Sequence, residues 1–255
     1  MFKELYNYRQ LLKSNVSKEI RGKYKGSFLG VLWSFVNPLL MTLVYAIVFP
    51  FILKSTQPHY VTFIVIAILP WTWFTSVISQ GTNTIVVNGG IIKKVYFPRE
   101  ILPISIVTSG LINFLISCLI IVIFLICSGI GFSWNIIFLP LIVLTQYILQ
   151  LGLIFITSSI DVYIRDAEYI IAFIVSMVFY GTPILYSSDL FPAKVGWLLN
   201  LNPLTTIIES YRNIFYYQTM PDFKALGIVF LVSCFILFIG YKIFKKLEKG
   251  FAEEL

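Results

Sequence analysis

One long stretch without charge constrains this chain more than any other feature. Residues 101–160 contain no Asp, Glu, Lys or Arg, and a soluble domain cannot cover its surface with such residues. One membrane-crossing helix needs about 20 apolar residues, so this stretch suits two helices. Ser128-Gly129-Ile130-Gly131 is predicted to separate them. Only 12% of all residues are charged, about half the share in an ordinary soluble domain. The sequence therefore predicts an integral membrane protein.

Other apolar runs complete the expected fold. We predict the first and second spans at residues 30–53 and 60–79, the third and fourth within 101–160, the fifth at 169–186 and the sixth at 225–241. A further uncharged run, residues 195–208, is too short to span and is interrupted by Asn202-Pro203. Short re-entrant helices are therefore expected between spans 5 and 6. The predicted fold class is an all-α membrane protein with six transmembrane helices.

The first twenty residues have the pattern of an amphipathic helix. Apolar side chains recur at steps of three and four, at Phe2, Leu5, Tyr8, Leu12, Val16 and Ile20. Polar and charged residues fill the positions between them. This pattern is typical of a helix that lies in the membrane interface. Its role is either a simple anchor or a place where a cytosolic partner docks.

Lysine and arginine favour one orientation of the spans. With the N-terminus inside, the cytoplasmic segments hold fifteen of the 19 Lys and Arg residues, and the outer segments hold Lys54, Lys194, Arg212 and Lys224. Such an excess marks the cytoplasmic side of membrane proteins. We therefore expect both termini in the cytoplasm. The net charge of +7 is then explained by topology and anionic lipid, and no nucleic-acid partner is expected.

A basic segment follows the amphipathic helix. Arg21, Lys23 and Lys25 stand beside Gly22 and Gly26, at the expected level of the inner-leaflet headgroups. They are either a positive-inside cluster or a site for a phosphate or pyrophosphate headgroup, because Arg can bind such an anion through two hydrogen bonds. The sequence leaves both interpretations open.

The absence of charge within the predicted spans excludes some functions. None of the six contains Asp, Glu, Lys, Arg or His, whereas ion-coupled transporters generally need ionisable groups there. Asp161-Val162-Tyr163 breaks the DxD pattern of a glycosyltransferase, and no GxxxxGK[ST] phosphate loop occurs. We therefore predict no catalytic residue, no metal site and no cofactor in this chain. If it pumps, a partner must supply the energy.

Several motifs along the chain resemble one family. Arg21-x-x-Tyr24-Lys25-Gly26-Ser27-x-Leu29-Gly30-x-x-Trp33, followed by Asn37-Pro38-Leu39, is similar to the opening of ABC-2 type polysaccharide export permeases. Later segments also match this family: Val95-Tyr96-Phe97-Pro98-Arg99-Glu100-Ile101-Leu102-Pro103, Arg165-Asp166, Thr182-Pro183-Ile184-x-Tyr186, Asn202-Pro203-Leu204-Thr205 and Glu209-x-Tyr211-Arg212. The motifs occur in order over nearly the whole chain.

The resemblance implies a membrane subunit of an ATP-driven exporter in the bacterial inner membrane. Such subunits form a homodimer, bind two copies of a cytoplasmic ABC ATPase that holds ATP and magnesium, and move undecaprenyl-linked glycans such as O-antigen, capsule or teichoic acid. It also implies one ABC-2 type transmembrane domain over residues 1–255. Its expected parts are an interface helix and basic loop (1–28), spans 1 to 5 (30–186), a re-entrant outer gate (187–222), and span 6 with the cytoplasmic tail (223–255).

Three groups of site residues follow from the resemblance. The entrance for the lipid pyrophosphate is expected at Arg21, Lys23, Tyr24, Lys25, Leu29 and Gly30. Coupling to the ATPase is expected at Gly89, Gly90, Lys93, Lys94, Tyr96 and Arg99. The outer gate is expected at Asn202, Pro203, Glu209 and Arg212.

Aromatic residues suggest a fourth group. Sugars present C–H faces that stack on aromatic rings, so a glycan channel is expected to be lined by Tyr45, Phe49, Phe173, Phe179 and Tyr180. Trp71 and Trp73 are weaker candidates for the same role. The alternative is an ordinary aromatic belt at the membrane interface.

Two other functions stay open at this point. One is an exporter of drugs or small lipids with the same architecture. The other is a membrane glycosyltransferase or scaffold that acts on the same lipid carrier.

Overall fold

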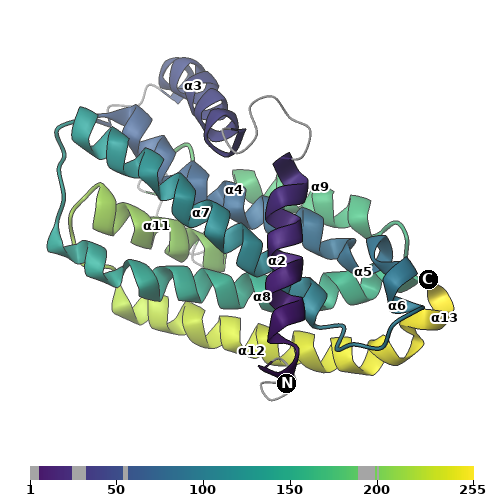
Figure 1. The fold of residues 1–255 in the computed structure, drawn as a ribbon. Helices are drawn as coiled ribbons and strands as arrows, with labels where there is room; N and C mark the ends of the chain where they lie inside the picture. The colour runs from purple at the N-terminus through teal and green to yellow at the C-terminus, as the bar shows by residue number, and fades with distance from the viewer. Residues whose placement is uncertain (1–5, 25–32, 54–56, 189–198, 200) are drawn as a thin grey trace.

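The computed structural model describes residues 6–24, 33–53, 57–188, 199 and 201–255, and every regular element in them is a helix. Most of the helices lie roughly along one direction and form an elongated body (Figure 1). In the described ranges, four helical segments are long and apolar enough to cross a membrane. These are α4 (Tyr60–Thr82), α7 (Ile101–Cys127), α8 with the short helix η2 before it (Trp134–Tyr163), and α12 with the helical tail after it (Phe223–Glu254).

The break predicted between the third and fourth spans lies where the glycines are. Helix α7 ends at Cys127, and η2 (Trp134–Phe138) leads into α8 (Leu139–Tyr163). Gly129 and Gly131 have φ of +72° and +77°, a backbone conformation that glycine adopts without steric cost. The two glycines therefore turn the chain back at this point.

The fifth predicted span is shorter in the structure than in the sequence prediction. Helix α9 (Ala167–Tyr180) has 14 residues and ends six residues before the predicted limit at Tyr186. Thr182-Pro183 follows, and a proline restricts the residue before it to non-helical backbone. Because about 20 residues are needed to cross the hydrocarbon core, α9 alone does not reach through it. Helix α3 (Trp33–Leu53) corresponds to the first predicted span.

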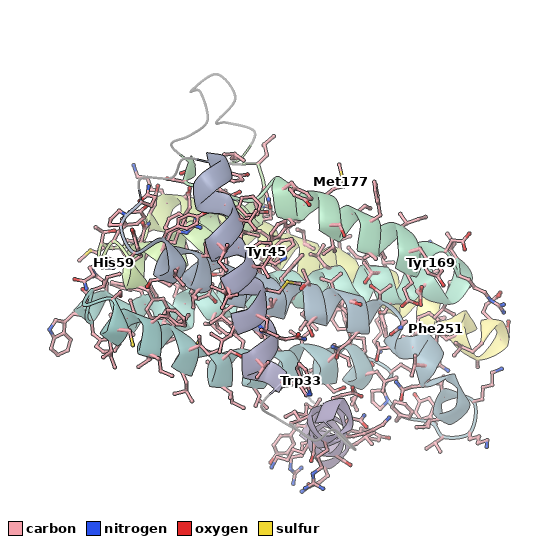
Figure 2. All side chains as sticks on the ribbon, turned by 90° about the horizontal axis from the view of Figure 1, so that it is seen from above. Trp33, Tyr45, His59, Tyr169, Met177 and Phe251 are labelled. Atoms are coloured by element: carbon pink, nitrogen blue, oxygen red, sulfur yellow. The ribbon has the colours of Figure 1, made fainter. Side chains whose placement is uncertain are left out.

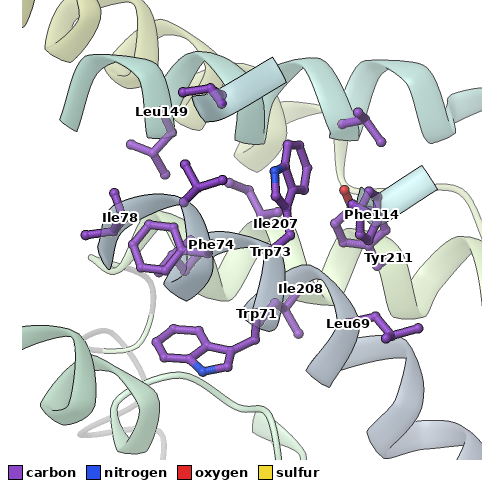
Figure 3. Close-up of a cluster of buried hydrophobic side chains, with 14 of the residues drawn as sticks. Leu69, Trp71, Trp73, Phe74, Ile78, Phe114, Leu149, Ile207, Ile208 and Tyr211 are labelled. Atoms are coloured by element: carbon purple, nitrogen blue, oxygen red, sulfur yellow. The ribbon is translucent and has the colours of Figure 1, made fainter. Parts of the chain in front are cut away.

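Helix α4 is the centre of the body. It packs against α7, α3, α8 and α11 (Pro203–Phe215), and most of its residues are buried. Trp73 of α4 stacks on Phe114 of α7 with ring centroids 4.8 Å apart. Phe114 in turn meets Tyr211 of α11 edge-on at 5.7 Å. Figure 3 shows this core, which joins three helices from distant parts of the chain.

Helices α8 and α12 (Phe223–Leu247) form the most extensive helix pair. They approach closely at two glycines, Gly152 and Gly240. A Cβ atom at Gly152 would lie 2.6 Å from the backbone nitrogen of Leu237, and one at Gly240 would collide with the carbonyl oxygen of Gly152. Small residues at such crossings let two backbones come together in membrane proteins.

Helix α2 (Arg9–Tyr24) runs across the long axes of α7, α8 and α12 (Figure 1). It packs on α7. The predicted apolar positions Tyr8, Leu12, Val16 and Ile20 are half-buried, and charged residues such as Lys13 are exposed. The structure therefore has an amphipathic helix here. Phe2 and Leu5, the first two residues of the predicted apolar face, lie outside the described residues.

Two ends of the body are distinct. Figure 2 shows His59 at one end and Tyr169 and Phe251 at the other. We refer to these as the His59 end and the Phe251 end. The Phe251 end includes the short helices α5 (Thr84–Val87), α6 (Gly89–Ile92) and α13 (Phe251–Glu254), together with the turn η4 (Glu248–Gly250).

Candidate functional site

The residues predicted for coupling lie at the Phe251 end. Helices α5 and α6 continue from α4 and lead through residues 93–100 into α7. Tyr96 is 91% exposed and Lys93 and Lys94 are also exposed. The segment forms an exposed surface, here called the α5–α6 surface, that consists of Val86, Val87, Gly90, Ile91, Lys93, Lys94, Val95 and Tyr96. Apolar side chains grouped in this way mark interaction sites.

Two predicted coupling residues do not belong to the α5–α6 surface. Gly89 is buried against the side chain of Leu255. A Cβ atom at Gly89 would lie 3.4 Å from the nearest atom of that side chain. Arg99 is half-buried, donates a hydrogen bond to the backbone carbonyl of Glu248 and lies 5.8 Å from the centre of the Phe251 ring. Both residues therefore face the end of the chain.

The residues predicted for the pyrophosphate entrance are only partly described. Arg21 is exposed on α2 and lines a groove of about 420 Å³ between α2 and α7, together with Ile20, Thr108 and Ile112. Lys23 and Tyr24 lie in the last turn of α2, and their side chains are not among those described. Lys25, Leu29 and Gly30 lie outside the described residues.

A second hollow opens on the same helix, α7. This cavity of about 410 Å³ is lined by α3, α4 and α7, and it includes Trp33, Asn37 and Pro38 from the motif at the opening of the chain. Five polar side chains contribute to its lining, from Asn37, Thr72, Ser76, Asn113 and Ser117. Convergent polar groups in an otherwise apolar pocket are the usual mark of a ligand site.

Four of the five aromatic residues predicted to line a channel lie together. Tyr45 has its ring centroid 5.7 Å from Phe49 and 6.0 Å from Phe179, and Phe179 lies 5.4 Å from Tyr180. Trp71, a weaker candidate in the sequence, joins them at 5.5 Å from Phe179. The cluster thus links α3, α4 and α9.

The other two aromatic candidates lie away from this cluster. Phe173 is exposed on α9, two turns before Phe179. Trp73 is buried in the core against Phe114.

The residues predicted for an outer gate begin α11. Asn202 caps this helix because its side-chain oxygen accepts a hydrogen bond from the Leu204 amide at 3.0 Å. Its side-chain nitrogen donates to Thr182 Oγ1 at 2.8 Å, which ties the start of α11 to the segment after α9. Pro203 occupies the first turn, where a missing N–H costs nothing. Glu209 is half-buried farther along the helix.

Arg212 holds the segment after α9 in place. Its side chain is 2% exposed and donates hydrogen bonds to the backbone carbonyls of Pro183, of Ile184 at 2.6 Å and of Tyr186 at 3.3 Å. The guanidinium also lies 3.6 Å from the centre of the Phe63 ring. One cation thus satisfies backbone carbonyls of the non-helical segment that follows α9.

Sequence reasoning missed two interactions of buried polar groups in separate parts of the body. Glu100 forms an ion pair with Lys245, and Gln146 donates a hydrogen bond to the carbonyl of Pro70 at 2.8 Å. Pro70 in α4 was a visible signal, because a proline inside a helix disturbs its hydrogen bonds. Nothing in the spacing of Glu100 and Lys245 indicates that they meet.

Comparison with known proteins covers the whole chain. Residues 10–216 match the family of ABC-2 type transporters. The chain belongs to this family. It is 34% identical over 257 residues to the O-antigen export system permease protein RfbA of Myxococcus xanthus. The aligned region covers 100% of this chain and 99% of that protein.

Two further relatives have the same description. These O-antigen export system permease proteins RfbA, both from Klebsiella pneumoniae, are 35% and 33% identical over 249 residues, 96% of this chain and 95% of each relative. As an ABC-2 transporter subunit with four long apolar helices, the chain is a multi-pass membrane protein that serves transport.

Proposed function

We propose that this chain is the permease subunit of an ATP-driven exporter that moves lipid-linked polysaccharide, such as O-antigen, across the bacterial inner membrane. The similarity to O-antigen export permeases over nearly the full length of the chain carries this proposal. The absence of ionisable groups from the predicted spans supports it, because the chain then needs an external source of energy.

The proposed topology has six spans, with α3 and α9 added to the four long helices. Segment 181–188 extends the fifth span beyond α9, and α11 is the re-entrant helix after it. The Phe251 end faces the cytoplasm, because lysines are in excess on the cytoplasmic side of membrane proteins. The lysines at this end are Lys93, Lys94, Lys246 and Lys249. Helix α2 then lies along the inner face of the membrane, and both termini are cytoplasmic.

A homodimer is the proposed form of the permease. Helices α3 and α9 expose apolar side chains, among them Leu43 and Ile47 of α3 and Ile174 and Met177 of α9. In the dimer, α3 and α9 of one chain would contact the same helices of the second chain. Such an isologous contact is typical of a two-fold dimer. The aromatic cluster around Tyr45 adjoins this face, so it would border the passage for the glycan.

The proposed partner is a cytoplasmic ABC ATPase, two copies per dimer, which binds ATP and magnesium. Its docking site is the α5–α6 surface, because the surface is apolar, cationic at its edge and exposed at the cytoplasmic end. Aromatic side chains at such interfaces often carry much of the binding energy.

Tyr96→Ala is expected to weaken binding of the proposed ABC ATPase partner by about 5- to 30-fold, the usual effect of truncating an aromatic hot spot. Titration of the ATPase onto the detergent-solubilised permease measures the affinity. Trp134→Ala is the matched control, because Trp134 is 92% exposed in η2, which follows the far end of α7. Equal affinity of the two variants would place docking elsewhere.

The proposed entrance for the substrate follows α7 from Arg21 to the cavity at Trp33. Arg21 lines the groove with Thr108 and Ile112, and the polar cavity beside it includes Gly110 and Asn113 of the same helix. A pyrophosphate headgroup at Arg21 would thus lie next to polar groups that its first sugar could contact. Arginine suits a pyrophosphate because it can donate two parallel hydrogen bonds.

Arg21→Gln is expected to reduce glycan-stimulated ATP hydrolysis by about tenfold or more at low substrate concentration, since one charge-assisted contact contributes about 1.5–3 kcal/mol. The assay uses permease, ATPase and undecaprenyl-diphosphate-linked glycan in proteoliposomes. Arg9→Gln is the control on the same helix, because Arg9 is also exposed but contacts Tyr6. If both variants resemble the wild type, Arg21 belongs to a positive-inside cluster only.

The same proteoliposomes test the function itself. Movement of the lipid-linked glycan that requires ATP supports the proposal. Stimulation by hydrophobic drugs or small lipids instead of the glycan would favour the alternative exporter. Sugar transfer to the lipid carrier without any ATPase would favour a glycosyltransferase.

A further inference from the structure

The end of the chain folds back onto the Phe251 end of the body. After α12, η4 and α13 bring Phe251 into a position where its side chain is 0% exposed. The Phe251 ring meets Phe244 edge-on at 5.5 Å and lies 6.3 Å from the ring of Tyr163. Chain termini are usually poorly ordered unless something ties them down. This terminus is tied down by specific contacts.

A buried ion pair joins the same segment to α7. The carboxylate of Glu100, which is 1% exposed, pairs with Lys245 in the last turn of α12. Lys245 also contacts the carboxylate of Glu248 at 3.0 Å. A buried carboxylate is costly unless a cation and hydrogen bonds compensate it. The start of α7 and the end of α12 are therefore held in one arrangement.

Three further contacts surround this pair. Arg99 donates to the backbone carbonyl of Glu248 and lies over the Phe251 ring. Tyr163, at the end of α8, donates a hydrogen bond to the carbonyl of Leu247 at 2.8 Å. The side chain of Leu255 packs against Gly89 of α6. The last residues of the chain thus touch α6, α7 and α8 at once.

Helix α6 needs such support. Among the described helices, α6 packs mainly against the adjoining α5, and α6 itself is only four residues long. The outer face of α6 belongs to the α5–α6 surface, whereas Gly89 on its inner face rests on Leu255. A force on the α5–α6 surface would therefore reach the tail directly.

We propose that Arg99, Glu100, Lys245 and the tail 248–255 form a clasp that positions the α5–α6 surface and transmits its movement to α7 and α12. This inference rests on the proposed function, because the movement comes from the ATPase. The clasp residues touch neither glycan nor nucleotide and are positioning residues. Lys245 links Glu100, directly before α7, to α12, a span that extends to the opposite end of the body.

Lys245→Met and Phe251→Ala test the clasp in proteoliposomes with the ATPase and the undecaprenyl-linked glycan. Both variants are expected to bind the ATPase within about threefold of wild type and to keep hydrolysing ATP. Glycan moved per ATP hydrolysed is expected to fall about tenfold. Lys246→Met, an exposed neighbour on the same helix turn, is the matched control and is expected to match wild type.

Exchanging the charges of Glu100 and Lys245 tests whether the ion pair itself, and not either residue alone, is needed for coupling. Glu100→Lys alone is expected to lose coupling, and Glu100→Lys with Lys245→Glu is expected to regain it at least partly, as interacting neighbours do in a double-mutant cycle. If one of these variants fails to fold, a disulfide cross-link tests the clasp instead. It joins Gly89→Cys to Leu255→Cys in a chain whose native Cys118, Cys127 and Cys234 are changed to Ala. The cross-link is expected to leave transport intact, because α6 and the tail move together.

Three results would overturn the clasp. The first is an unchanged ratio of glycan moved to ATP hydrolysed in Lys245→Met and Phe251→Ala. The second is a loss of transport on cross-linking. The third is a loss of ATPase binding that parallels the loss of transport, which would make the tail part of the docking site. If wild-type permease neither binds the ATPase nor moves glycan, the proposed function fails instead.

Discussion

Arg212→Met is expected to destabilise the permease by about 3–6 kcal/mol, because several buried carbonyls lose their donor and each costs about 1–3 kcal/mol. The carbonyls of Pro183, Ile184 and Tyr186 all accept hydrogen bonds from this one guanidinium. Methionine fills much of the same volume and cannot donate. Most single substitutions cost less than this. Thermal unfolding in detergent, followed by loss of the monodisperse peak in gel filtration, measures the effect.

Two variants sharpen this test. Arg212→Lys keeps the charge but lacks the planar fork, so its stability is expected to lie between Arg212→Met and wild type. Lys224→Met removes an exposed cation at the start of α12 and is expected to unfold like the wild type. If Arg212→Met unfolds at the wild-type temperature, the carbonyls have found other donors, and Arg212 does not hold this segment.

The same residue shows where sequence reasoning reached its limit. Arg212 is one of the four Lys and Arg residues in the predicted outer segments, and the family motif placed it at an outer gate. Its three acceptors lie 26 to 29 residues earlier in the chain. No local pattern indicates such a contact, because it depends on how α11 packs under the end of α9. The sequence therefore identified the residue and missed its partners.

Local chemistry was predicted more successfully. The turn after α7 is determined by Gly129 and Gly131, whose positive φ is a property of glycine itself. The cap of α11 at Asn202-Pro203 is likewise a local preference. By contrast, the helix in the predicted fifth span ends at Tyr180, six residues before the limit predicted for that span. Apolar residues continue to Tyr186, and their periodicity does not reveal that Pro183 has already ended the helix.

The candidate sites show the same contrast between local features, which the sequence indicates, and long-range contacts, which it does not. Residues 93–96 are consecutive in the sequence and exposed in the structure, and their role in coupling stays a prediction. The contact of Arg99 and Glu100 with the tail joins positions almost 150 residues apart. The proximity of the Arg21 groove to the Trp33 cavity also required the structure, since both are built on α7.

Gly240→Leu is expected to destabilise the pairing of α8 and α12 by about 3 kcal/mol or more, the upper part of the range for overpacking a close contact. A Cβ at Gly240 collides with the backbone oxygen of Gly152. This neighbour cannot move aside as a side chain would. The two helices form the most extensive pair of the body, so the melting temperature is expected to fall by about 6–12 °C.

Gly227→Leu is the control for this effect on the same helix. Gly227 is exposed, and a Cβ there would meet no atom within 4 Å. Both changes replace a helical glycine by leucine, and both gain helix propensity by about 0.8–1 kcal/mol. Gly227→Leu is therefore expected to match or exceed the wild-type melting temperature, and the difference between the two variants isolates the crossing.

Gly152→Leu completes the test from the other side of the crossing. A Cβ at Gly152 would lie 2.6 Å from the backbone nitrogen of Leu237, so this variant alone is expected to cost about as much as Gly240→Leu. Because either leucine already forces the helices apart, Gly152→Leu with Gly240→Leu is expected to cost less than the two single effects added. Strictly additive losses of stability would mean that the two glycines act at separate contacts. An unchanged melting temperature for Gly240→Leu would mean that α8 and α12 do not approach closely at this glycine.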